Sequence, residues 1–432
     1  MTGRDNPECP ASVRAELDRK RGSTGANGPL GSNDVWAVGF SLPSYKRAGG
    51  GLMRVIVLGA GFGGLELSTR LSEALGEETD VVLIDKAEGF TFGFSKLDVM
   101  FGRTSPDDAF HRYADIVKPG VRFVRSTVRA IDAPGKSVET DDGAFRGDVL
   151  VVALGADLQP EATPGLVEGG HEFYTVAGAF GLREVLARFE GGRVIVGVTS
   201  TPFKCPPAPS ETALLLHDFL SERGCRDRSQ IDLVMPLGVP IPPSPDASKA
   251  LLEAFAERDI GWHPGQLVSH LDPAAKVARF ADGTEMPYDL FLGVPLHKVP
   301  QVVEQSGLCV DGWIPVDPRT LETSVPDVFA VGDVTSVGTP KAGVFAEGQA
   351  AVVAEGLIAR HRRGGAAPGY EGRGVCYLEF GQDQVAKVDV TFRPGQAPFG
   401  TWDPPSVDSS ADKAEFGSSR IRRWFGREWA AV

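Results

Sequence analysis

A glycine-rich loop, Gly59-Ala60-Gly61-Phe62-Gly63-Gly64, lies between a β-branched run at 55–57 and a leucine-rich stretch with helical spacing at 65–75. In a dinucleotide-binding fold, the first glycine of such a loop permits a tight turn, and the second lets a diphosphate approach the backbone. The third allows close packing of the following helix. These roles fall on Gly59, Gly61 and Gly64. The alternative is a flexible glycine-rich loop without a ligand.

An acidic residue supports the dinucleotide interpretation. Asp85 follows a second apolar run at 81–84 and lies 21 residues after Gly64, where a carboxylate can accept hydrogen bonds from an adenosine ribose. Strand, loop, helix, strand and acid therefore occur in the order of a Rossmann fold. Both NAD and FAD satisfy this pattern, so it leaves the cofactor open.

Two later motifs favour FAD. A strand-like run at 328–331 ends in Gly332-Asp333, which resembles the motif whose aspartate binds the ribityl chain in flavoproteins with two dinucleotide-binding domains. The segment 151–156, with Gly155, resembles the crossing between domains in the same enzymes. The alternative for Asp333 is a helix N-cap. Together the motifs predict an α/β fold with two Rossmann-like dinucleotide-binding domains, as in glutathione reductase, and a C-terminal interface region.

Changes of pattern divide the chain further. The stretch before the first strand is rich in Gly, Ser and Asn and lacks apolar periodicity, so we expect it to be disordered. A second α/β unit opens with a strand at 193–198 and a helix at about 210–223. The expected segments are the disordered extension 1–52, the first part of the FAD domain 53–160, the second Rossmann-like domain 161–310, the second part of the FAD domain 311–365, and the C-terminal region 366–432 with a terminal amphipathic helix.

A lysine precedes the helix expected at 343–360. Lys341 lies in the turn Thr339-Pro340-Lys341-Ala342-Gly343, and the turn would bring it and the first amides of the helix beside the flavin pyrimidine. Positive potential there stabilises an anionic reduced flavin. The alternative is an ordinary surface lysine.

The loop after the first strand of the second unit departs from the glycine pattern. Residues 199–211 carry four prolines and no glycine. Since proline lacks an amide hydrogen, a nucleotide diphosphate would find neither donors nor room in this loop. The sequence therefore disfavours NAD(P)H as the reductant.

The same loop contains a cysteine. Cys205 follows Lys204 and shortly precedes the expected helix. A neighbouring cation and a helix N-terminus both favour the thiolate, so we expect a nucleophilic sulfur. The alternative is a small buried hydrophobic residue.

At this point the chain resembles the sulfide:quinone oxidoreductases and the flavoprotein subunit of flavocytochrome c sulfide dehydrogenase, over about residues 53–395. Six segments carry the resemblance: Cys-Pro-Pro-Ala-Pro-x-Glu at 205–211, Trp262-His263-Pro264-Gly265, the segment 312–317, Gly332-Asp333, Pro340-Lys341-x-Gly343, and Val375-Cys376-Tyr377. It implies FAD-dependent oxidation of sulfide or a related small sulfur compound, with a quinone as electron acceptor.

The resemblance also implies a redox-active disulfide. In the family, a disulfide joins the cysteine of the Cys-Pro-Pro segment to one near the start of the C-terminal region, and Cys205 and Cys376 match these positions. Hydrosulfide would open the disulfide by thiol exchange, leaving a persulfide on one cysteine and a thiolate on the other. Glu211 matches the glutamate of the motif and is the candidate proton acceptor. The alternative for Glu211 is a helix acid in the first turn.

The chain departs from the family in two places. Many sulfide:quinone enzymes have a third active-site cysteine, and the corresponding place lies near Tyr174. No cysteine occurs at 90–94, where some relatives attach FAD covalently, so we expect non-covalent FAD. Cys9, Cys225 and Cys309 receive no role, and the cysteine spacing predicts no metal site.

Charge and hydropathy limit the partners. Lys and Arg number 44 against 57 Asp and Glu, and the resulting net charge of −13 argues against nucleic acid. The sequence has no run of 18 apolar residues and no secretory signal, so we expect a cytoplasmic protein.

The C-terminal stretch mixes apolar and basic residues. On a helix, one face would carry Ile421, Trp424, Phe425, Trp429 and Val432, with Arg420, Arg422, Arg423 and Arg427 near it. Such a helix can bind a membrane surface, where quinone is found, so we expect a peripheral protein on the inner face of the cell membrane. The alternative is a helix packed on its own domain or on a partner in a homodimer.

Two other functions fit the fold. One is a type 2 NADH dehydrogenase-like enzyme, and the other is a flavin-bearing redox sensor that does not turn over. Reduction of the flavin by NADH or by sulfide separates them from the leading hypothesis.

Overall fold

The computed structural model describes residues 52–365 and 368–431. Except for Leu52, the N-terminal extension expected to be disordered lies outside these residues, and so does Cys9.

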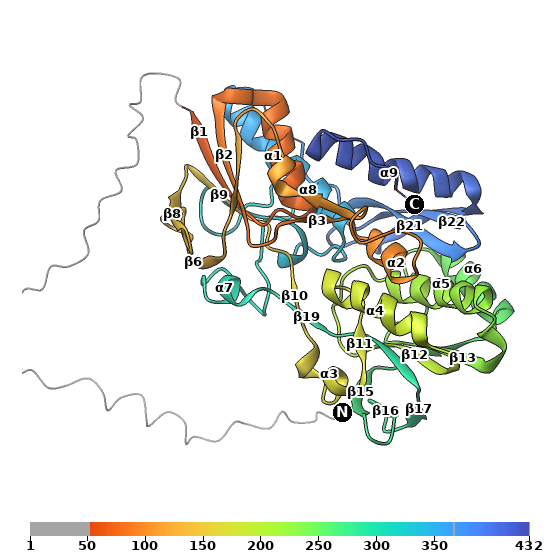
Figure 1. Cartoon of the computed structure of the whole chain (residues 1–432). Helices are drawn as coiled ribbons and strands as arrows, with labels where there is room; N and C mark the ends of the chain where they lie inside the picture. The colour runs from red at the N-terminus through yellow and green to blue at the C-terminus, as the bar shows by residue number, and fades with distance from the viewer. Residues whose placement is uncertain (1–51, 366–367, 432) are drawn as a thin grey trace, which may run out of the picture. The chain divides into compact units, whose positions relative to one another are not determined.

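The first of two parallel sheets begins with the strand that precedes the glycine loop. β1 (Met53–Leu58) is almost entirely apolar and buried, as is typical of a parallel strand covered on both faces. The sheet has the order β20-β9-β1-β2-β5. The other strands are β2 (Thr79–Asp85), β5 (Val121–Arg125), β9 (Val149–Val152) and β20 (Val328–Ala330). Helices α1 (Phe62–Leu75) and α8 (Gly343–His361) lie side by side next to this sheet (Figure 1).

The second sheet is also parallel, with the order β11-β18-β12-β13-β14. Its strands are β11 (His171–Glu172), β12 (Gly192–Val198), β13 (Ser229–Met235), β14 (Ile260–Pro264) and β18 (Leu290–Val294). Its associated helices are α4 (Val176–Arg188), α5 (Ala208–Glu222) and α6 (Pro245–Glu257). The paired strands β10 (Asp157–Gln159) and β19 (Leu296–Lys298) carry the chain to this sheet and back. Two Rossmann-like α/β units are thereby confirmed.

Smaller elements complete the two units. Antiparallel groups are β3 (Gly89–Thr91) with β4 (Phe110–Arg112), β6 (Val128–Asp132) with β7 (Ser137–Thr140) and β8 (Gly143–Arg146), and β15 (Val268–Asp272) with β16 (Val277–Phe280) and β17 (Glu285–Pro287). The short helices are α2 (Ser95–Met100), α3 (Leu166–Gly169) and α7 (Gln301–Glu304).

The C-terminal region forms an antiparallel sheet and a long helix. The sheet contains β21 (Arg373–Gly381), β22 (Gln384–Thr391) and β23 (Phe399–Ser406), and α9 (Val407–Phe425) follows it. The residue pattern at 385–392 is typical of a strand and corresponds to β22, whereas Pro404 and Pro405 hide β23 in the sequence. An edge strand tolerates proline, and β23 lies at the edge of its sheet.

The apolar face of α9 is buried, which contradicts the expected membrane contact. Ile421 and Trp424 are fully buried and Phe425 is 5% exposed. The Trp424 ring lies 5.7 Å from the ring of Phe90 and packs edge to face. Trp429, beyond the helix end, stacks on Phe92 with centroids 6.3 Å apart. Val432 lies outside the described residues. The helix therefore packs on its own chain, which was the alternative.

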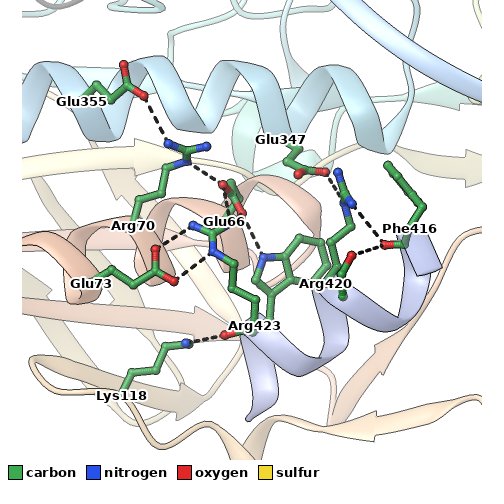
Figure 2. A network of polar contacts seen from close by, with 11 residues as sticks. Glu66, Arg70, Glu73, Lys118, Glu347, Glu355, Phe416, Arg420 and Arg423 are labelled. Carbon is green, nitrogen blue, oxygen red and sulfur yellow. Dashed lines mark hydrogen bonds and ion pairs between the residues drawn. The ribbon is translucent and has the colours of Figure 1, made fainter. Parts of the chain in front are cut away.

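The basic residues of α9 are also engaged within the chain. Figure 2 shows Arg423 between Glu66 and Glu73 of α1, with ion-pair distances of 2.7 and 2.9 Å. Arg420 pairs with Glu347 of α8 at 2.9 Å. Arg422 pairs with Glu428, and Arg427, which follows the end of the helix, pairs with Asp115. These cations are neutralised by carboxylates of the protein, so they offer little attraction to anionic lipid. Within residues 52–365 and 368–431, no helix has the length and apolar character needed to cross a membrane.

Candidate active site

The glycine loop has the geometry that a diphosphate requires. Gly59 adopts φ +97°, and a Cβ there would lie 2.4 Å from the carbonyl oxygen of Ala153. A Cβ on Gly64 would lie 1.9 Å from the carbonyl oxygen of Gly59, so the helix packs too closely for a side chain. A Cβ on Gly61 would meet no atom of the described residues within 4 Å. Gly61 is the N-cap of α1 without a side-chain cap, so the amides of the first turn face open space and suit an anion.

Asp85 holds this loop in place. Its Oδ2 accepts a hydrogen bond from the Ala60 N–H at 2.7 Å, and its Oδ1 accepts one from the Ala87 N–H at 2.8 Å. Each carboxylate oxygen has a second lone pair, so these bonds leave room for the predicted ribose contact.

A cavity of about 370 Å³ collects residues that lie far apart in the sequence. Of the predicted site residues, it is lined by Gly61, Gly155, Cys205, Glu211, Gly332, Asp333 and Cys376, but not by Gly59, Gly64, Asp85 or Lys341. The aromatic segment at 90–94 and Tyr174 also line it. Tyr174, near which the resemblance to the family places a third cysteine, thus lies in the same cavity.

Asp333 faces the cavity and is not a helix N-cap, because α8 begins at Gly343 with Ala342 as its N-cap. Gly332, with φ +81°, donates its N–H to Oε1 of Gln349 at 2.7 Å. Burial raises the pKa of Asp333 above its ordinary value. Gln349 fixes this turn, and its role could not be predicted because it lies among the alanines of a helix.

Lys341 lies at the turn that follows β20. It is 8% exposed and is not a surface lysine. Its Nζ donates to the carbonyl oxygens of Asp333 and Thr335 at 2.7 and 3.2 Å, and it lies 3.2 Å from the ring centroid of Trp313. Burial lowers the pKa of Lys341 to about 8. The side chain therefore braces the turn after β20 and does not line the cavity, although the N-terminus of α8 does.

Two other lysines line the cavity. Lys96, on α2, donates to the carbonyl oxygen of Tyr174 at 2.5 Å, and Lys204 donates to that of Ala156 at 3.0 Å. Burial and the nearby charge of Lys204 lower the pKa of Lys96 to about 8. No motif surrounds Lys96, so its place in the cavity could not be predicted from the sequence. The two ammonium groups favour the entry of a small anion.

Cys205 has a less acidic thiol than its sequence neighbours suggest. Its backbone adopts φ +47°, and its N–H donates to the carbonyl oxygen of Lys341 at 2.7 Å. The residue is accessible from the cavity that it lines, and the walls of this cavity surround it. Desolvation, followed by the charge of Glu211, raises the pKa of Cys205 well above its usual value. The prediction of a stabilised thiolate was wrong, because burial outweighs the helix amide and because Lys96, and not Lys204, is the helpful cation.

Cys376 lies on β21 and lines the same cavity. Burial, followed by the charges of Glu211 and Asp389, raises its pKa to about 12. Cys205 and Cys376 are both free thiols in the structure, which is the reduced form of the predicted pair.

Glu211 is a buried acid in the first turn of α5, 5% exposed. Its Oε1 accepts a hydrogen bond from the Glu379 N–H at 3.1 Å. Burial raises the pKa of Glu211 to about 7. A carboxyl that titrates near neutral pH beside two thiols is well suited to accept and release a proton.

The loop between β12 and α5 forms part of this cavity. Pro207 is the N-cap of α5, and Pro209 follows in its first turn. Lys204 and Cys205 of this loop line the cavity. The loop therefore lacks the amides that a second dinucleotide would need.

Comparisons with known proteins agree with this architecture. A family model described as pyridine nucleotide-disulphide oxidoreductase matches residues 53–354. The mitochondrial sulfide:quinone oxidoreductase of Mus musculus is 25% identical over 359 residues, which cover 79% of this chain and 79% of the relative. The sulfide:quinone oxidoreductase structure from Aquifex aeolicus superposes with a TM-score of 0.77 at 20% identity, covering 87% of this chain and 92% of the other. An alternative NAD(P)H-ubiquinone oxidoreductase of Arabidopsis thaliana is 28% identical over 219 residues, 45% of this chain and 40% of the relative.

Proposed function

The chain belongs to the pyridine nucleotide-disulphide oxidoreductase family, and from this premise we propose that it oxidises sulfide, or a related small sulfur compound, and reduces a quinone. The protein is an FAD-dependent oxidoreductase, and the electrons pass from sulfur to quinone through FAD. One observation carries the proposal: Cys205, Cys376 and Glu211 line one cavity with Gly61 and Asp333. The sulfide:quinone oxidoreductases among the relatives support the same substrate pair.

The residues present fit FAD. The open space at Gly61 and the tight packing at Gly59 and Gly64 suit the diphosphate, and Asp85 serves the adenosine ribose. Gly155, Gly332 and Asp333 would hold the remainder of the cofactor. The absence of cysteine at 90–94 favours non-covalent binding. When bound, FAD takes up two electrons from the sulfur pair and passes them to the quinone.

The side chains of the cavity supply the sulfur chemistry. Lys96 and Lys204 attract hydrosulfide, which attacks one sulfur of an oxidised Cys205–Cys376 pair. The S–S bond between the cysteines breaks, a new S–S bond to the incoming sulfur forms, and the other cysteine leaves as a thiolate. Glu211 accepts the proton of the new persulfide.

A type 2 NADH dehydrogenase is the competing function, since one relative is named an alternative NAD(P)H-ubiquinone oxidoreductase. The proline-filled loop before α5 disfavours it. Steady-state turnover with a soluble quinone separates the candidates. We expect quinone reduction with sulfide and much slower reduction with NADH or NADPH. Turnover with a nicotinamide and none with sulfide would reject the proposal, and a single reduction without turnover would indicate a redox sensor.

A further inference from the structure

Glu211 belongs to a cluster of five charged residues at α5, α2, β21 and α9. The cluster consists of the three carboxyls Asp98, Glu211 and Glu379 and the two cations Arg103 and Lys413. Asp98, Glu211, Glu379 and Lys413 are each at most 5% exposed. Arg103 is partly buried, with a side chain 24% exposed.

The contacts within the cluster are unequal. Oε1 of Glu379 forms an ion pair with Lys413 and a second one with Nη2 of Arg103, the latter at 3.2 Å. Glu211 accepts a hydrogen bond from the backbone N–H of Glu379. Neither oxygen of Asp98 has a hydrogen-bond partner among the described residues, and its ion-pair contact is Nε of Arg103 at 3.4 Å. The negative charge of Glu379 is thus balanced by two nearby cations, whereas Asp98 and Glu211 have fewer stabilising contacts.

The charges do not balance if every group is ionised. Three carboxylates and two cations leave one negative charge in a buried place, which is costly. The other groups beside Glu211 do not change this count, because the pKa values of Cys205, Cys376 and Tyr174 are raised by burial and these groups stay neutral. One proton on the cluster removes the excess charge.

The contacts leave two of the three carboxyls able to hold this proton, because Glu379 has two cation contacts and neither Asp98 nor Glu211 has as many. Burial opposes ionisation of Glu379, but the charges of Lys413 and Arg103 lower its pKa. Burial raises the pKa of Asp98 and that of Glu211. The proton therefore belongs to Asp98 or Glu211.

We propose that Asp98 and Glu211 share a single proton, so that Asp98 is a positioning residue that sets the protonation of Glu211 at the sulfur site. The inference rests on the proposed function for its catalytic meaning. A proton taken up by Glu211 from a persulfide displaces the shared proton from the cluster. Two other members of the cluster, Arg103 and Glu379, line a second cavity of about 290 Å³.

The charge count predicts opposite effects for two substitutions. Asp98→Asn leaves two carboxyls for two cations, so Glu211 should ionise at lower pH. Lys413→Met removes a cation, so Glu211 should remain protonated to higher pH. A change of about one pH unit, or tenfold in proton affinity, is expected in each direction. Lys387→Met is the matched control. Lys387, on β22, pairs with the exposed Asp412 of α9, the neighbour of Lys413, and lies outside the cluster.

The test is infrared titration of buried carboxyl groups in the FAD-loaded protein, combined with flavin reduction by sulfide across the same pH range. Wild type should show one protonated carboxyl signal from the cluster at neutral pH. Either Asp98→Asn or Glu211→Gln alone should remove it, and Lys387→Met should not. If Asp98→Asn does not fold, the opposite shift in Lys413→Met and the loss of signal in Glu211→Gln still decide the question.

The outcomes separate the two claims. An unshifted Glu211 titration in both Asp98→Asn and Lys413→Met, with sulfide still reducing the flavin, overturns the shared proton and leaves the proposed function intact. The predicted infrared changes in a protein whose flavin sulfide cannot reduce support the shared proton and reject the proposed function.

Discussion

Glu211 is the residue whose ionisation should govern the pH dependence of catalysis. A proton acceptor must be ionised, and burial raises the pKa of Glu211 to about 7. The rate of sulfide oxidation should therefore rise with pH through about 7, when rates are expressed per hydrosulfide anion. Glu211→Gln should lower the rate by about 10²-fold or more and abolish this dependence. Stopped-flow flavin reduction across the pH range is the measurement, and a variant that keeps both the rate and the pH profile would exclude Glu211 as the acceptor.

For individual residues, the sequence predicts which side chains form the site better than it predicts their ionisation. Cys205, Glu211 and Cys376 were chosen from motifs, and the structure brings them to one cavity. The ionisation of Cys205 was predicted from Lys204, its neighbour in the chain, whereas burial and Glu211 dominate. Lys96 and Gln349 could not be predicted, because their importance depends on contacts with segments far away in the sequence.

The element that the sequence specifies best is the strand, loop and helix at 53–75, and its glycines offer a matched pair of substitutions. A Cβ at Gly64 would meet the Gly59 carbonyl oxygen at 1.9 Å, whereas one at Gly61 meets open space. Gly61→Ala should fold normally and lose about tenfold or more in FAD affinity, since an obstructed diphosphate loses amide contacts of about 1.5 kcal/mol each.

Gly64→Ala should instead destabilise the protein itself, because the helix must move away from the loop. Unfolding of the apoprotein and titration with FAD distinguish the two effects. Equal FAD affinity in Gly61→Ala and wild type would argue against a diphosphate at this loop.

Helix α9 is an element whose role could not be predicted from its amphipathic pattern. The pattern is the same for a helix that faces lipid and for one that faces the protein. What fastens α9 to the protein is its contact with Glu66 of α1. This buried carboxylate forms ion pairs with Arg423 and Arg70 (Figure 2). It also accepts a hydrogen bond from Nε1 of Trp424 at 3.0 Å. Burial opposes its ionisation, but the hydrogen bonds from Arg423 and Trp424 lower the pKa of Glu66.

Loss of this contact should be costly. Arg423→Met should lower the free energy of unfolding by about 3 kcal/mol, because it leaves the buried Glu66 without its main cation. Arg373→Met breaks an exposed pair between Arg373 of β21 and Asp389 of β22, so it should cost about 0–1 kcal/mol. Denaturant unfolding of both variants is the measurement. Equal losses would show that the Glu66 contact does not fasten α9.

For the whole molecule, the order of motifs was enough to predict two Rossmann-like units, and the two parallel sheets confirm them. The third strand of the C-terminal sheet was hidden by prolines, and the docking of α9 depends on packing that no local pattern encodes. The exact limits of the predicted segments at 160, 310 and 365 stay a proposal.

The central claim is that electrons from sulfide reach the flavin through Cys205 and Cys376. Its most direct test is anaerobic reduction of the flavin by sulfide in wild type, Cys205→Ser, Cys376→Ser and the double variant, each loaded with FAD. Wild type should bleach rapidly with sulfide. Each single variant should keep its FAD and lose most of this reduction, and the double variant should be no worse than either, because residues that act as a unit give non-additive losses. Near wild-type bleaching in both serine variants would contradict the claim.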